Sequence, residues 1–131
     1  MDPSARHRLQ QDQGSATAEF AMVASLLVLL VLAIIQFAGM IHVRNTLIDA
    51  ASTGARFGAL DDRTAEDGVE RARSLIASSV SDRYAQDISY TYRPDENGQV
   101  LEITVEAQYP VLVVLTGAGN LEATGSAYVY E

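Results

Sequence analysis

The sequence predicts an α+β protein: a long N-terminal transmembrane helix extended into a small domain with a second helix and a three-stranded antiparallel sheet. Three observations predict this fold class. The first is a 22-residue apolar run, Phe20–Ile41. The second is helical spacing of apolar residues beyond that run, and the third is a change to two-residue alternation from Asp87 onward. A chain of 131 residues has room for one anchor and one small folded domain.

The apolar run is long enough to cross a bilayer. At about 1.5 Å per residue it spans about 33 Å, against a hydrocarbon core of about 30 Å. Only Ser25 and Gln36 interrupt it with polar groups. The main alternative is a cleaved secretory signal, whose apolar core usually has about 7–15 residues before a small-x-small site. We favour a retained anchor because this run is longer and helical periodicity continues past Ile41.

The flanks of the run carry nearly balanced positive charge. Arg6, His7 and Arg8 precede it, and His42 and Arg44 follow it. The positive-inside rule by itself therefore says little about the orientation of this helix in the membrane. The short polar N-terminus and the larger acidic domain favour a cytoplasmic N-terminus and an extracytoplasmic C-terminal domain.

The negative charge of the chain lies in its C-terminal half. Residues 1–60 carry four acids and four arginines, whereas residues 61–131 carry thirteen acids and five arginines, the whole net charge of −8. An acidic domain of this kind repels nucleic acid, so we expect no nucleic-acid partner. We interpret the charge mainly as a source of solubility. The absence of cysteine excludes disulfides and thiolate metal sites.

The first helix is predicted to continue to about Ala59. Beyond the membrane it carries two rows of small residues, each repeating every four positions: Ala50, Gly54 and Gly58 in one row, and Ala51, Ala55 and Ala59 in the other. Glycine inside a helix costs about 1 kcal/mol relative to alanine, so a close backbone neighbour is expected at this face. We favour packing against the chain's own domain, and a subunit contact stays open as the alternative.

A second helix is predicted from Thr64 to about Tyr84. Asp61-Asp62 marks a turn, and Thr64 with Asp67 fits a capping box. Acids at the start of a helix suit the positive end of its dipole. They lack the glycine-punctuated alternation of a calcium loop, so we predict no metal site. The acids of this cluster are Asp61, Asp62, Glu66, Asp67 and Glu70.

Three strands complete the predicted domain. The first begins at Asp87, and Asn97-Gly98 is a strong hairpin signal before a return strand, which Pro110 ends or interrupts with a bulge. Val111–Leu115 is predicted as a short buried strand or helical turn, and Gly117–Asn120 as a loop. Leu121–Glu131 is the third strand. Two tyrosine pairs, Tyr90 with Tyr92 and Tyr128 with Tyr130, each share a face, so we expect them to pair across strands and pack at the core or its rim.

No catalytic constellation is found in the sequence. The two histidines, His7 and His42, flank the membrane segment without a cysteine or paired acid nearby. No Ser/His/Asp set, phosphate loop or zinc spacing can be assembled. We therefore predict a protein that is not an enzyme, without catalytic residues or cofactors.

Two blocks of sequence carry a resemblance to a known family. The first is Gly14–Phe20, a glycine with Glu19 and Phe20 five and six residues later, followed at once by the apolar run. The second is Asn45–Ala59, with its alanines, Gly54, Ala55 and Arg56 beyond the membrane. In this order and spacing the segment from residue 14 to residue 59 resembles the TadE-like family of tight-adherence (Tad/Flp) pilus proteins, a branch of the type IV pilin superfamily.

The resemblance implies a pilin-like fold and a processing site. Prepilin peptidase would cleave between Gly14 and Ser15, and Glu19 would then neutralise the new amine of Ser15 or of a neighbouring subunit. The implied function is that of a noncatalytic minor pilin or pseudopilin in assembly, priming or tip placement of a Tad-type pilus. The implied partners are other pilins or pseudopilins through the N-terminal helix, the prepilin peptidase and the inner-membrane assembly platform.

The expected organisation follows from these inferences. Residues 1–14 are a leader, 15–41 the transmembrane part of the helix, 42–60 its extramembrane continuation and 61–131 an acidic extracytoplasmic α+β domain. The expected location is the bacterial cytoplasmic membrane, with the cell-surface pilus as a further location. The alternative is a bitopic membrane-anchored envelope protein whose acidic domain binds an unrelated partner.

Overall fold

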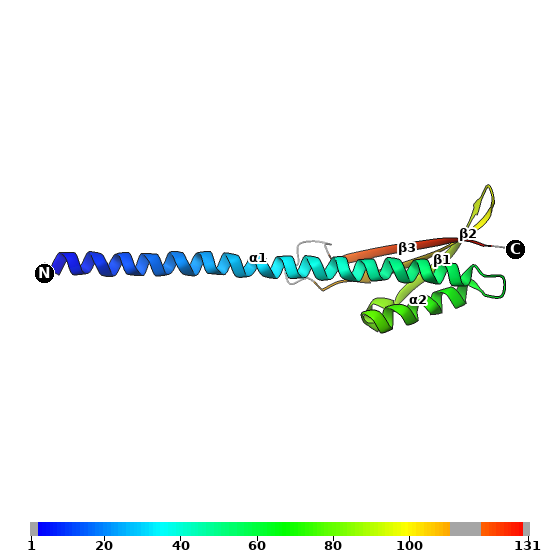
Figure 1. The fold of residues 1–131 in the computed structure, drawn as a ribbon, viewed down its shortest axis with the longest axis horizontal. Helices are drawn as coiled ribbons and strands as arrows, with labels where there is room; N and C mark the ends of the chain where they lie inside the picture. The colour runs from blue at the N-terminus through cyan, green and yellow to red at the C-terminus, as the bar shows by residue number, and fades with distance from the viewer. Residues whose placement is uncertain (1–2, 111–118, 130–131) are drawn as a thin grey trace. The chain divides into compact units, whose positions relative to one another are not determined.

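A computed structural model describes residues 3–110 and 119–129 (Figure 1). In chain order, its elements are α1 (Pro3–Gly58), α2 (Ala65–Ser79), the 3-10 helix η1 (Asp82–Ala85), β1 (Asp87–Asp95), β2 (Gly98–Gln108) and β3 (Asn120–Val129). The predicted α+β class is confirmed: a long apolar N-terminal helix, a second helix and a three-stranded antiparallel sheet. Helix α1 begins well before the apolar run, with Pro3 in the first turn, where a missing N–H is no loss.

The chain forms two compact units, and α1 contributes to both. The first unit ends at Phe37, and the second begins at Ala38 and includes α2, η1 and the sheet. In the second unit α1 buries a stripe at helical spacing, which includes Val43, Leu47, Ala51 and Ala55. The last part of α1, from Ala38 to Gly58 and about six turns long, is thus part of the folded domain.

The sheet has the order β1-β2-β3, with both neighbouring pairs antiparallel. The register places Ile103 of β2 opposite Tyr90 of β1 and Gly125 of β3. Because directly opposite residues share a face, alternate residues of β2 make one apolar face, as the sequence predicts. Leu101, Ile103 and Val105 on that face are fully buried.

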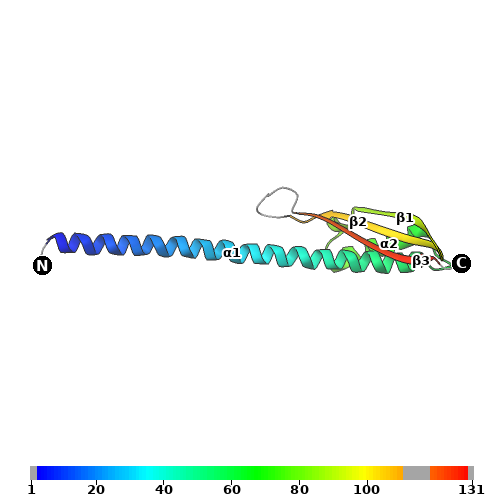
Figure 2. The ribbon, with the colours of Figure 1, turned by 90° about the horizontal axis from the view of Figure 1, so that it is seen from above.

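The domain has two layers. The strands lie over α2 and over the C-terminal part of α1 (Figure 2). Leu47 of α1, Ile76 of α2 and the β2 residues Leu101, Ile103 and Val105 are the largest fully buried side chains between these layers. Among the described residues no polar or charged residue is buried. Apolar burial, at about 25 cal/mol per Å², therefore holds the two layers together.

Helix α2 ends earlier than predicted. It stops at Ser79, and Asp82–Ala85 forms a separate 3-10 helix rather than the last turn of α2. Val80 leaves the helical region with φ −128° and ψ −71°. Ser81 is extended, and its side chain accepts a hydrogen bond from the Arg83 N–H and so caps the new turn. This break turns Tyr84 into the core, where it is 7% exposed.

The β1–β2 hairpin is present where Asn97-Gly98 predicts it. The turn itself is Glu96-Asn97, and Gly98 pairs with Asp95 as the first residue of β2. Gly98 has φ +134°, a conformation open to glycine and strained for other residues.

The predicted pairing of tyrosines across strands is wrong for the described residues. Strand β2 separates β1 from β3, so Tyr90 and Tyr92 oppose Ile103 and Leu101, while Tyr128 opposes Val100 on the other face. Tyr90 instead contacts Tyr92 edge to face, with ring centroids 6.0 Å apart, and Tyr84 stacks on Tyr109 with centroids 6.5 Å apart. The predictions for Val111–Leu115, for Gly117-Ala118 and for Tyr130-Glu131 lie outside the described residues.

Candidate functional site

The predicted processing site lies in the exposed N-terminal part of α1. Gly14 and Ser15 are both helical and exposed. A Cβ atom on Gly14 would meet no side chain of the described residues within 4 Å. One turn along, the Thr17 hydroxyl donates to the Gln13 carbonyl at 2.9 Å, so the surrounding turn satisfies its own polar groups. The Gly14–Ser15 bond is therefore open to solvent but held in helical backbone.

Glu19 and Phe20 form the entrance to the apolar run. Both are exposed, and the Phe20 ring is 74% exposed. Ser15 and Glu19 are four residues apart and so lie on one side of α1, a spacing at which side chains can meet. This spacing follows from the helix itself, because both residues lie in α1.

The apolar run presents its side chains outward. An 18-residue window of α1 has a mean hydropathy of 2.7, and none of it is buried. Exposed apolar surface of this extent exceeds what soluble monomers carry, so it needs lipid or other helices around it. Large side chains of the run that are more than half exposed are Phe20, Met22, Val23, Leu26, Leu27, Val28, Leu29, Leu30, Val31, Ile34, Ile35 and Phe37.

The first small-residue row of α1 lies against α2. A Cβ on Gly54 would come within 2.6 Å of the Gly68 carbonyl oxygen and 3.0 Å of the Ala72 Cβ. A Cβ on Gly58 would come within 3.0 Å of the Thr64 carbonyl oxygen and 2.9 Å of the Leu101 Cδ2 atom. Ala50, in the same row, is buried. Two helix backbones are thus in direct contact, through glycines of both helices.

The second row of α1 lies against the sheet. A Cβ on Gly125 of β3 would come within 2.4 Å of the Ala51 carbonyl carbon and 2.2 Å of the Ser52 nitrogen. Ala51 and Ala55 are fully buried. All six small residues of the two rows are therefore buried in the chain's own domain. Whether any of them also reaches a second subunit stays a prediction.

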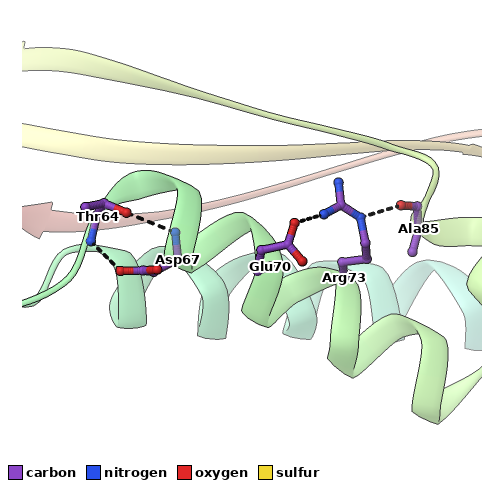
Figure 3. Close-up of polar contacts among 5 residues, drawn as sticks. All are labelled: Thr64, Asp67, Glu70, Arg73 and Ala85. Atoms are coloured by element: carbon purple, nitrogen blue, oxygen red, sulfur yellow. Dashed lines mark hydrogen bonds and ion pairs between the residues drawn. The ribbon is translucent and has the colours of Figure 1, made fainter.

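The acidic start of α2 is organised by a capping box (Figure 3). The Asp67 N–H donates to the Thr64 hydroxyl at 3.2 Å, and the Thr64 N–H donates to the Asp67 carboxylate at 3.0 Å, which completes the capping box. One turn further, Arg73 pairs with Glu70, and its Nε donates to the Ala85 carbonyl at 3.4 Å. These contacts stabilise the start of α2 and join α2 to η1.

Glu66 is tied to the sheet by a hydrogen bond. The Tyr90 hydroxyl donates to its carboxylate at 2.6 Å. This bond, followed by a backbone hydrogen bond, lowers the pKa of Glu66 from its ordinary value. The same bond raises the pKa of Tyr90, since the phenol must lose its proton beside a carboxylate. The contact joins α2 to β1 at the rim of the core.

The outer face of the sheet carries a row of like charges. The register places Asp87, Glu106 and Glu122 side by side across the three strands. All three are exposed. Like charges directly opposite each other are unfavourable, so this row contributes no stability and keeps anionic surfaces away.

Sequence reasoning missed two positions that shape the domain. Gly125 is read from the sequence only as part of a strand, yet it is where β3 meets the α1 backbone. Tyr109 follows β2. A Cβ atom added to Gly39 would lie only 2.2 Å from the Tyr109 hydroxyl oxygen. A glycine in a strand does signal a bulge or a close backbone approach, which could have identified Gly125.

These observations define a class of protein: a candidate single-span membrane protein whose anchor helix continues into a small α+β domain. Residues 14–56 match the family model described as TadE-like protein. The resemblance predicted from the sequence is thereby confirmed over this segment, and it agrees with membership of the pilin superfamily. The family indicates an involvement in the Tad pilus. Comparison with curated proteins and with solved structures gave no match.

Proposed function

We propose that the protein is a noncatalytic minor pilin or pseudopilin in the assembly, priming or tip placement of a Tad-type pilus. One observation carries the proposal: the TadE-like match covers both the Gly14–Phe20 block and most of the apolar helix that follows it. The exposed apolar run needs lipid in the membrane or other helices in a filament, and a pilin uses both in turn. In this proposal the N-terminus lies in the cytoplasm and the domain lies outside.

Processing would create the assembly site. Cleavage between Gly14 and Ser15 by the prepilin peptidase removes the basic leader and leaves an amine at Ser15. Glu19 lies about one turn further along α1, about 6 Å along the helix axis. A carboxylate paired with an amine at the edge of the bilayer is much cheaper than a lone one. Pairing with the amine of a neighbouring pilin sets the register between two helices on the assembly platform.

The helical conformation of the site has a consequence for cleavage. A peptidase acts on backbone that has opened locally, and openings near a helix end require little free energy. Gly14 lowers the local helix stability by about 1 kcal/mol relative to alanine. The glycine thus serves both recognition and access.

The first test is the N-terminus of the protein in cells. In a strain with an active prepilin peptidase, mass spectrometry is expected to find Ser15 as the first residue. Gly14→Val should leave the full leader attached, because the side chain blocks the site and stiffens the turn. Ala33→Val, which adds bulk within the apolar run, should be processed normally. Recovery of wild-type chain that begins at Met1 or Asp2 would contradict the proposal.

The second test concerns Glu19. Glu19→Ala should be cleaved but should enter pili, or support their assembly, much less well than wild type. Asp12→Ala is the matched control, since it removes an acid from the leader and gives the same mature chain. Pilus yield is measured by shearing and quantifying surface filaments. Normal yield with Glu19→Ala would rule out the pairing role while leaving the processing result intact.

A further inference from the structure

The last residues of the apolar run belong to the folded domain. The run is Phe20–Ile41, and the domain begins at Ala38. Gly39 lies in this overlap and packs against Tyr109, which directly follows β2: a Cβ atom on Gly39 would lie 2.2 Å from the Tyr109 hydroxyl oxygen. A tyrosine at the end of the sheet thus contacts a residue of the predicted membrane span.

The depth of this contact in a membrane follows from helix geometry. Glu19 is charged, so the hydrocarbon core begins after it, at about Phe20. The twenty residues from Phe20 to Gly39 span about 30 Å, which is the thickness of that core. Gly39 therefore lies where hydrocarbon meets the lipid head groups, and a tilt of the helix would place it deeper. The Tyr109 hydroxyl lies at the same depth.

Tyr109 is held in this position by the domain. Its ring stacks on the buried ring of Tyr84, with centroids 6.5 Å apart and planes 14° apart. The Tyr109 N–H donates to the Gly119 carbonyl at 2.7 Å, which ties the end of β2 to the residue before β3. Tyr109 is only partly buried, so part of the residue is accessible from outside the domain.

The charged groups near this end of the domain fit the same depth. Arg44 is exposed and lies five residues beyond Gly39, about 8 Å further along α1. The head-group layer is about 5–8 Å thick on each side of the hydrocarbon core, so the Arg44 guanidinium reaches the level of the lipid phosphates. Among the described residues no carboxylate forms an ion pair with Arg44.

The acidic row of the sheet lies beyond the head groups. Strand β2 runs back along α1, since Tyr109 packs at Gly39 and Leu101 packs at Gly58 (Figure 2). Glu106 is three residues before Tyr109, about 10 Å further from the hydrocarbon core. Its neighbours in the row therefore also lie in water, where their charges are solvated.

We propose that the base of the domain, formed by Gly39 and Tyr109, rests in the head-group layer of the bilayer that α1 crosses. Tyrosine suits this layer because its ring is apolar and its hydroxyl is polar. The contact fixes the depth of the domain and leaves no exposed helical stalk between the membrane and the sheet. It needs a bilayer around the apolar run, but neither cleavage at Gly14 nor a pilus, so its test and the processing test can fail separately.

The chain has no tryptophan, so a single introduced tryptophan reports its own depth. The full chain carrying Tyr109→Trp is reconstituted into phosphatidylcholine vesicles whose lipids carry a nitroxide quencher at the head group or at the middle of the acyl chain. Leu30→Trp, in the middle of the run, is the control for insertion. Tyr92→Trp is the control for the far end of the sheet, since its partner Leu101 is about 26 Å from Tyr109 along β2.

Tyr109→Trp should be quenched several-fold more strongly by the head-group nitroxide than Tyr92→Trp, and more strongly by that probe than by the mid-chain probe. Leu30→Trp should show the reverse preference for the two probes. Quenching of Tyr109→Trp no stronger than that of Tyr92→Trp, or strongest with the mid-chain probe, would overturn the proposal. Leu30→Trp without mid-chain quenching would overturn it as well, because the run would then lie outside the bilayer.

The role of Gly39 is tested in the chain that carries Tyr109→Trp. Adding Gly39→Leu fills the space beside the ring, so head-group quenching should fall. Ala38→Leu, at the neighbouring exposed position, is the matched control and should leave quenching unchanged. Near-UV circular dichroism checks that both variants keep the folded domain. Equal quenching in the two folded variants would refute the claim that packing at Gly39 sets the depth.

Discussion

The contact between α1 and α2 leaves no room for a methyl group, and Gly54→Ala tests this directly. The added Cβ would lie 2.6 Å from the Gly68 carbonyl oxygen, about 0.8 Å closer than the 3.4 Å at which ordinary contacts begin. Both groups belong to helix backbones, so relief requires the two helices to separate. Separation in turn loosens Leu101 and Ile103, which pack at the same place.

The expected loss of stability combines two opposing effects. Overpacking typically costs about 1–3 kcal/mol, and a backbone clash lies at the upper end of that range. Alanine has a higher helix propensity than glycine, which offsets about 1 kcal/mol of this loss. We therefore expect a net loss of about 1–2 kcal/mol. For a domain of this size, that lowers the thermal midpoint by about 4–16 °C.

The assay is thermal unfolding of the full chain in detergent, followed by near-UV circular dichroism. All six tyrosines lie beyond Ala38 and there is no tryptophan, so the signal reports the domain and not the anchor. Thr53→Ala, at the exposed neighbouring position, is the control and should leave the midpoint unchanged or slightly raised. A midpoint for Gly54→Ala equal to or above wild type would refute the packing argument.

Three further predictions rest on contacts of the same domain. Gly125→Ala should destabilise the domain more than Gly54→Ala in the same unfolding assay, because its Cβ would lie 2.2 Å from the Ser52 nitrogen; an equal or smaller loss would contradict this. Thr64→Ala removes the capping box and should cost about 1 kcal/mol, with Thr53→Ala again as control; an unchanged midpoint would count against it. Tyr90→Phe should raise the Glu66 pKa back toward 4.5 in an NMR titration. Because the folded pKa of Glu66 is lowered, its contribution to stability is present above pH 4.5 and is lost as the pH falls through the folded pKa, a loss that Tyr90→Phe should reduce.

Local signals in the sequence predicted the elements well. The capping box at Thr64 and Asp67, the Asn97-Gly98 hairpin and the alternation of β2 depend on neighbours within a few residues. The small-residue rows of α1 also predicted a close backbone contact. These patterns have physical causes that act over one helical turn or one strand pair, so sequence spacing alone reveals them.

Other features depend on residues far apart in the chain. The separate η1 turn places Tyr84 in the core, where it stacks on Tyr109. The strand order puts β2 between the tyrosines of β1 and β3, which no local pattern specifies. The sequence likewise does not show that Gly54 packs against Gly68, because only the fold brings these two glycines together. At the candidate site, Gly14 and Glu19 were found from a motif, and their roles depend on other molecules.

The share of α1 inside the domain determines how a water-soluble fragment should be designed. Starting the polypeptide at Asp61 would discard Val43, Leu47, Ala51 and Ala55, all of them core residues. Leu101 and Ile103 would then face solvent, and aggregation on expression is the expected outcome. A fragment that begins just after Ile41 keeps these four core residues and omits the apolar run. Fragments made for secretion trials, crystallisation or antibody production should therefore include residues 42–58 of α1.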